Sequence, residues 1–68
     1  MTAVEKATLK LKIKIASHTT EMIENICLSL GGGILKEEAR MVRAYCLEEY
    51  ECRLGENAVD ELMIIMGM

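Results

Sequence analysis

The strongest constraint on this 68-residue chain is a strict alternation of apolar residues and lysine over residues 9–15. Successive side chains of a β-strand point to opposite faces, so this period of two places leucine and isoleucine on one face. The other face then carries Lys10, Lys12 and Lys14. A helix would distribute these lysines around its circumference. The alternation therefore predicts a half-buried strand over residues 8–15.

The sequence that follows has the spacing of apolar residues that is typical of amphipathic helices. One helix is predicted over residues 18–30, and three consecutive glycines end it. A second, longer helix is predicted over residues 34–54, with Gly55 as its stop. Three residues near the start of the first helix offer side-chain oxygens for capping: Ser17, Thr19 and Thr20.

The C-terminal segment is predicted to form a short helix over residues 58–66, with Asn57 as a capping residue. Its apolar run over residues 62–66 is also compatible with a buried strand, because periodicity does not separate the two for so short a run. The sequence thus predicts an α+β fold, in which one N-terminal strand is followed by two to three helices in a single small domain over residues 1–68.

The amount of apolar sequence predicts an oligomer. Hydrophobic residues make up 51% of the chain, whereas a monomer of this length buries only about 60% of the surface of its unfolded chain. A single strand also needs a partner strand for its backbone hydrogen bonds. We therefore expect an intertwined homodimer rather than a monomer.

The sequence offers little for catalysis or metal binding, so we expect no enzyme, no catalytic residues, no metal and no cofactor. The sole histidine, His18, lies between predicted elements, with no residue to orient it beside a nucleophile. Cys46 and Cys52 would point about 120° apart on a helix, which does not suit a zinc site. Cys27 and Cys46 are interpreted as small buried side chains, and Cys52 as partly exposed.

The expected location is the cytoplasm. An odd number of cysteines without short paired spacings is not typical of a secreted disulfide scaffold and favours a reducing compartment. The longest apolar run, residues 62–66, is far shorter than the roughly 18 residues of a membrane span, so no membrane association is expected.

The charge is divided unevenly along the chain. Residues 1–14 contain four lysines and one glutamate, a balance of +3, while residues 15–68 contain four basic and ten acidic residues, a balance of −6. A polyanion would therefore meet the N-terminal segment. The lysines of the predicted strand have two interpretations: they protect a free sheet edge against aggregation, or they contact DNA.

The order of strand, short helix, glycine turn and longer helix resembles the ribbon-helix-helix repressors of bacteria, archaea, and their phages and plasmids. The resemblance implies a homodimeric DNA-binding transcription regulator whose paired strands form a ribbon in the major groove. By that resemblance, Lys10, Lys12 and Lys14 face the bases, and the backbone amides at Gly33 and Ile34 anchor a phosphate. It implies double-stranded DNA as the partner.

An alternative from another class is a small, non-enzymatic protein-interaction module, such as an antitoxin, a phage inhibitor or an adaptor. Its apolar C-terminal segment would dock on a protein partner. The residues expected to bind this partner are Leu62, Met63, Ile65 and Met66. Retention on DNA at low salt would favour the regulator, and stoichiometric co-purification of another protein would favour the interaction module.

Overall fold

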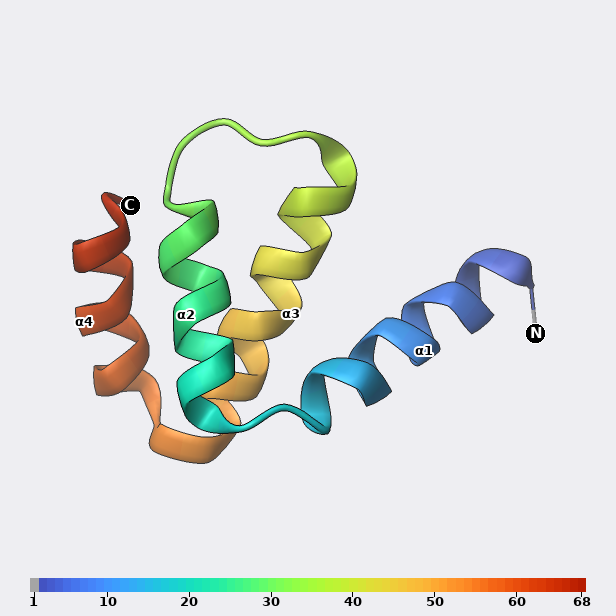
Figure 1. The fold of residues 1–68 in the computed structure, drawn as a ribbon, viewed down its shortest axis with the longest axis horizontal. Coiled ribbons are helices and arrows are strands. Elements are labelled where there is room, and N and C mark those ends of the chain that lie inside the picture. Colours follow the sequence, from blue (N-terminus) through green and yellow to red (C-terminus); the bar gives the residue numbers. More distant parts are fainter. Residues whose placement is uncertain (1) are drawn as a thin grey trace.

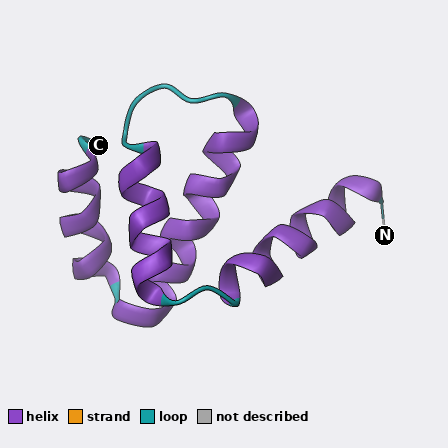
Figure 2. Cartoon of the chain, viewed as in Figure 1, coloured by secondary structure: helices purple, strands orange, loops and turns teal. Residues whose placement is uncertain are grey.

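A computed structural model describes residues 2–68 of the chain, and within this range the backbone forms four helices and no strand (Figures 1 and 2). The prediction of an α+β fold is therefore wrong, and with it the ribbon of paired strands. The helices are α1 (Ala3–Ala16), α2 (Thr20–Leu30), α3 (Glu37–Leu54) and α4 (Glu56–Met66). Helices α2, α3 and α4 lie side by side as a three-helix unit, and α1 projects from one end of this unit (Figure 1).

The segment predicted as a strand over residues 8–15 is helical because its alternation also satisfies a helix. Residues two apart on a helix differ by 200° in direction, so the run separates into two pairs spaced by four residues on nearly opposite faces. Leu11 and Ile15 form one pair and Leu9 and Ile13 the other. Ile15 is 3% exposed, whereas Ile13 is 61% exposed. The chain turns one pair toward its core and leaves the other in solvent.

Local chemistry also favours a helix in this segment. The side chain of Thr2 accepts a hydrogen bond of 3.1 Å from the backbone N–H of Glu5, which caps the first turn of α1. Leucine, lysine and alanine, which dominate the helix, all have high helix propensity. In addition, Val4 and Ala7 extend the face formed by Leu11 and Ile15 toward the N-terminus, at a spacing of three or four residues.

The remaining helices start two or three residues away from their predicted starts. Helix α2 begins at Thr20 because Thr19 accepts a hydrogen bond of 3.1 Å from the N–H of Met22. Helix α4 begins at Glu56, directly after Gly55, which has a φ of 93°. Asn57 therefore lies inside α4 and does not cap it. The run over residues 62–66, for which helix and strand were both open, is helical.

Helix α3 begins at Glu37, not at residue 34, because the glycine segment before it forms an extended loop held by an arginine. Nη1 of Arg43 donates hydrogen bonds of 2.9 Å to the carbonyl oxygens of both Gly31 and Gly33. Gly32 packs against the end of α4, and its N–H donates to the carbonyl of Met66 at 2.7 Å. A Cβ atom at Gly32 would lie 2.8 Å from that carbonyl oxygen, so this position needs glycine.

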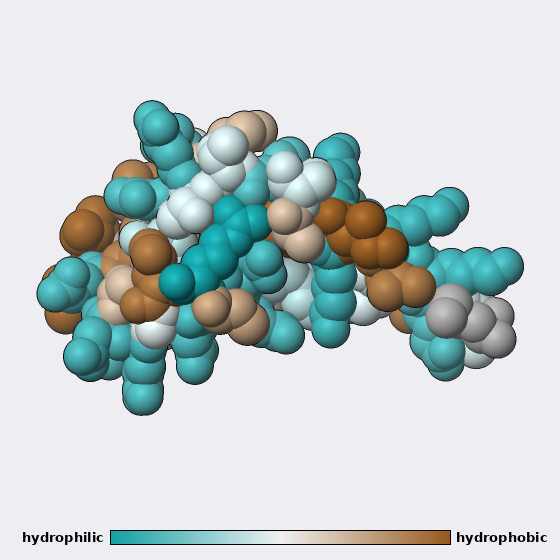
Figure 3. Space-filling view, turned by 90° about the horizontal axis from the view of Figure 1, so that it is seen from below, coloured by the Kyte–Doolittle hydropathy of each residue, from teal (hydrophilic) through white to brown (hydrophobic). Residues whose placement is uncertain are grey.

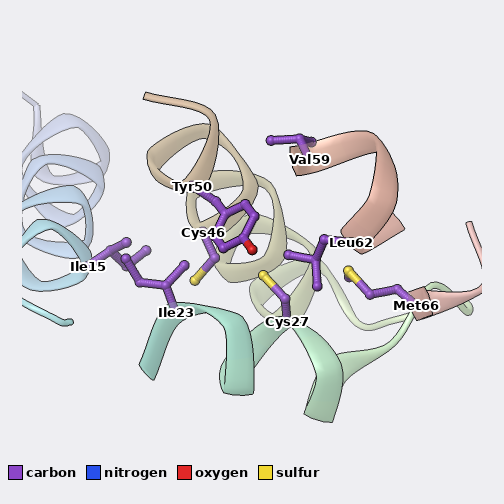
Figure 4. Close-up of a cluster of buried hydrophobic side chains, with 8 residues drawn as sticks. All are labelled: Ile15, Ile23, Cys27, Cys46, Tyr50, Val59, Leu62 and Met66. Carbon is purple, nitrogen blue, oxygen red and sulfur yellow. The ribbon is translucent and has the colours of Figure 1, made fainter. Parts of the chain in front are cut away.

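The core lies almost entirely between α2, α3 and α4 (Figure 4). Only one of its buried residues comes from α1, at the C-terminal end of that helix. The buried side chains are Ile15, Ile23, Cys27, Cys46, Tyr50, Val59, Leu62 and Met66. Helix α1 is therefore anchored at one end only.

A second arginine secures this anchored end. Nη2 of Arg53 in α3 donates to the carbonyl oxygen of Ala16 at 2.9 Å, which satisfies a backbone acceptor at the end of α1. Its Nη1 donates to Oγ1 of Thr20 at 3.2 Å, and its Nε forms an ion pair with Glu49 at 3.2 Å. Arg53 thus joins α1, α2 and α3 at their junction. None of the helices in residues 2–68 has the length and apolar character needed to span a membrane.

Candidate protein-interaction surface

An apolar groove of about 310 Å³ lies between α1 and the N-terminal half of α3. The groove exists because α1 is fixed near Ile15 while its other end projects away from the three-helix unit (Figure 1). We call it the α1–α3 groove. Its lining is mostly apolar and comprises Val4, Ala7, Thr8, Leu11, Glu38, Met41 and Val42. Val4 is 73% exposed, so the outer end of the groove is fully accessible to a partner.

Charged residues flank the α1–α3 groove, and Glu38 is the charged residue of its lining. Helix α1 has four lysines and one glutamate, whereas the first turn of α3 has Glu37 and Glu38. In the part of the chain that the structure describes, the only ion pair joins Arg53 to Glu49, so the lysines of α1 are not paired with these acids. Nζ of Lys12 instead lies 5.1 Å from the ring centroid of Tyr45, a cation–π contact between α1 and α3.

The structure does not bring together the residues predicted to bind DNA. Lys10 and Lys14 lie one turn apart on the same side of α1, whereas Lys12 is turned toward Tyr45. Gly33 and Ile34 lie in the α2–α3 loop, at the opposite end of α2 from α1 (Figure 1). They precede the first turn of α3 by three or more residues, so they do not form the helix start that was expected to anchor a phosphate.

The residues predicted to bind a protein partner divide between core and surface. Leu62 and Met66 are buried in the core, and Met63 is half-buried. Ile65 is 70% exposed, and its neighbour Ile64, which was not among the predicted partner-binding residues, is exposed as well. We call Ile64 and Ile65 the α4 outer face. In Figure 3, apolar surface gathers at the α4 end of the molecule and again along the side formed by α1.

The cysteines are arranged for packing rather than for chemistry. Cys27 and Cys46 are fully buried between α2 and α3 and Cys52 is exposed, as predicted. Burial, together with the neighbouring Cys46, raises the pKa of Cys27 to about 11. Burial also raises the pKa of Cys46. Both groups are therefore neutral thiols at physiological pH and are poor nucleophiles.

The position of the groove could not be read from the alternating run alone. Its residues on α1, such as Val4 and Ala7, precede the run, and Met41 and Val42 come from a helix that is distant in the sequence. The detectable signal is the helical spacing of Val4, Ala7, Leu11 and Ile15. Comparisons with protein-family models, with curated proteins and with solved structures found no match to this chain.

Proposed function

We propose that this chain is a non-enzymatic protein-interaction module that binds its partner in the α1–α3 groove. The observation that carries this proposal is an open groove lined by five apolar side chains beside a helix anchored at one end only. Exposed apolar surface that forms a groove with a charged rim is characteristic of protein-binding sites. Two diverging helices also offer the shape into which a third amphipathic helix docks.

The chemistry of the groove agrees with a binding role. Each Å² of apolar surface removed from water contributes about 25 cal/mol, so covering the exposed side chains of α1 would stabilise a complex. Thr8 and Glu38 are the polar groups in the lining and supply orientation rather than reactivity. The three cysteines, all within the described residues, are free thiols. We include the cytoplasm in the proposal, because free thiols persist in a reducing compartment.

The experiment that tests this proposal is site-specific photo-crosslinking in cells of the source organism. A photo-reactive phenylalanine derivative replaces Thr8, which lines the groove, and in the control variant it replaces Glu51, which is exposed on α3. We expect adducts that contain protein from the Thr8 position and far fewer from the control. If both positions give only background adducts, the groove is not a protein-binding site.

A second candidate function is contact with DNA through α1 itself. Lys6, Lys10 and Lys14 are exposed and spaced by four residues, so they form one row along the projecting helix. An α-helix fits the major groove, and lysine contacts phosphates. The balance of −6 in residues 15–68 opposes this function. For this reason we place DNA contact second.

A gel-shift titration at several salt concentrations tests DNA contact. Replacing the three lysines with alanine should reduce the log–log salt dependence of binding by about 0.9 for each phosphate that these lysines neutralise in the wild-type complex. Because these side chains are exposed, the fold should be retained, which circular dichroism checks. A wild-type protein that does not shift DNA even at low salt would remove this candidate.

A further inference from the structure

We infer that the partner in the α1–α3 groove is helix α1 of a second copy of this chain, in a symmetric dimer; this inference rests on the proposed interaction function. The α1 helix would then have two roles. It forms one wall of the groove in its own chain, and it fills the groove of its partner.

The exposed surface of the molecule is the first argument. The chain exposes 4829 Å², whereas a compact monomer of its mass exposes about 4,300 Å². Its radius of gyration is 11.9 Å, compared with about 11 Å for a compact chain of the same length. The excess of roughly 500 Å² is a large part of the roughly 800 Å² that each partner buries in a standard interface. Pairing through α1 would cover the part of the molecule that is least compact.

The shape of α1 is the second argument. One apolar stripe of α1 runs through Val4, Ala7, Leu11 and Ile15, and of these four residues only Ile15 is buried. In a two-fold dimer both chains contribute the same surface to the interface, so the apolar stripe of each α1 packs into the groove of the other chain. Two antiparallel α1 helices of about 21 Å with the N-terminal halves of both α3 helices would form a four-helix arrangement.

The charge of the groove is the third argument, and it favours a second copy over an unrelated partner. One side of the groove belongs to a helix with a balance of +3, and the other side begins with Glu37 and Glu38, which Arg40 follows one turn later. A uniformly acidic or basic partner would match one side and repel the other. A second copy carries both charges and, in antiparallel pairing, places its lysines beside these glutamates. Complementary charges of this kind fix orientation and register.

A charge-swap experiment tests the inference. One variant carries Lys10→Glu and Lys14→Glu, and the other carries Glu37→Lys and Glu38→Lys. In the homodimer of either variant, α1 of one chain and the first turn of α3 of the other chain carry like charges in both grooves. In the heterodimer formed in an equimolar mixture, the acidic α1 of one variant lies beside the basic first turn of α3 of the other. In the second groove, the basic α1 lies beside the acidic first turn of α3.

We expect wild type to form a dimer in sedimentation velocity and each variant to dimerise at least about tenfold more weakly, or about 1.4 kcal/mol. The mixture should recover the wild-type affinity as a heterodimer. The matched control is Glu56→Lys with Asp60→Lys, which reverses two exposed acids on α4, away from the groove, and should leave dimerisation unchanged. Circular dichroism and thermal melts of every variant distinguish a defect in association from a defect in folding.

Three results would overturn the inference. They are a wild-type protein that stays monomeric at the concentrations used for NMR, a dimer that the charge swaps leave intact, and a dimer that Ile64→Asp with Ile65→Asp abolishes while the groove variants do not. If the protein is monomeric but its Thr8 position still crosslinks to another protein, the partner is not a second copy, and the proposed interaction function is retained. If the protein is monomeric and gives no protein adduct, both the inference and the proposed function are wrong.

Discussion

Helices α2, α3 and α4 each pack against the other two, whereas α1 packs mainly against α3 and through one of its ends. The three-helix unit provides seven of the eight buried side chains of the core, and α1 provides only Ile15. Both regions are capped by threonine, and both carry apolar stripes. The difference between them is therefore one of tertiary packing and not of local helix chemistry.

Stability is distributed unevenly between the three-helix unit and α1. Most of the stability of a short helix in a protein comes from packing of its apolar face, since isolated helices of this length are marginal in water. The three-helix unit has this packing within one chain. Helix α1 has it at one end only, so its outer turns should open locally without unfolding the rest. A partner that covers the apolar stripe of α1 would give this helix the packing that it lacks within its own chain.

The largest expected effect comes from shortening one isoleucine in each region. Ile23 has no exposed surface, so Ile23→Ala should lower the free energy of unfolding by about 2–5 kcal/mol through reduced burial and the resulting cavity. Ile13→Ala removes the same atoms from an exposed site on α1 and should change stability by no more than about 0.5 kcal/mol. Urea denaturation followed by circular dichroism measures both. Equal losses would mean that α1 is as closely packed as the three-helix unit.

A pH-dependent effect confined to the three-helix unit should be nearly as large. The pKa of Cys27 is about 11 in the folded protein, against an ordinary value of 9.0. As the pH rises, the unfolded chain therefore loses this proton at a lower pH than the folded protein does. The stabilisation contributed by the neutral Cys27 thiol is fully present below about pH 9 and is lost as the pH rises to about 11. The shift corresponds to about 2–3 kcal/mol.

The Cys27→Ala variant isolates this contribution. Wild type and variant are unfolded with urea at several pH values between about 8 and 11. The stability advantage of wild type over the variant should shrink steadily across this range. Parallel curves for the two proteins would show that the Cys27 thiol is not desolvated in the folded state.

The sequence predicted helices over residues 18–30, 34–54 and 58–66 from their apolar spacing and from the glycines and capping residues at their boundaries, and the structure has helices over residues 20–30, 37–54 and 56–66. The prediction failed for α1 because the alternating run satisfies both periods, and the cap at Thr2 together with the core contact of Ile15 decides for the helix. The strand interpretation needed a partner strand, whereas the helix needs only the core contact of Ile15. The boundary at residue 34 failed because Arg43 holds the glycine loop in an extended form, a contact that no local pattern encodes.

The α1–α3 groove was not among the surfaces predicted from the sequence. The lysines of the N-terminal segment were correctly placed on the surface, but their arrangement on one face was wrong because that face belonged to a strand. Among the C-terminal residues, Leu62 and Met66 were needed for the core of the same chain. Apolar residues in a short chain serve either the core or a partner, and the sequence does not distinguish these two uses.

The smallest expected effect comes from removing the same cap in each region. Thr19→Ala should lower global stability by about 1 kcal/mol, because it caps a helix that unfolds with the whole unit. Thr2→Ala removes an equivalent hydrogen bond from α1 and should reduce its helix content while the urea midpoint hardly changes. Comparing far-ultraviolet circular dichroism before unfolding with the urea midpoint separates the two outcomes. A fall in the midpoint for Thr2→Ala would show that α1 unfolds together with the unit.

Native-state hydrogen exchange, measured by NMR across a range of protein concentrations, tests most directly whether α1 is a helix completed by a second copy of the chain. We expect the amides of α1 to exchange much faster than those of α2, α3 and α4 at low concentration, and to become progressively more protected as the dimer forms. The slowest amides of the three-helix unit should already be protected at the lowest concentration. Protection of α1 that equals that of α3 at every concentration, or chemical shifts typical of a strand over residues 9–15, would show that α1 is not a helix completed by a second copy.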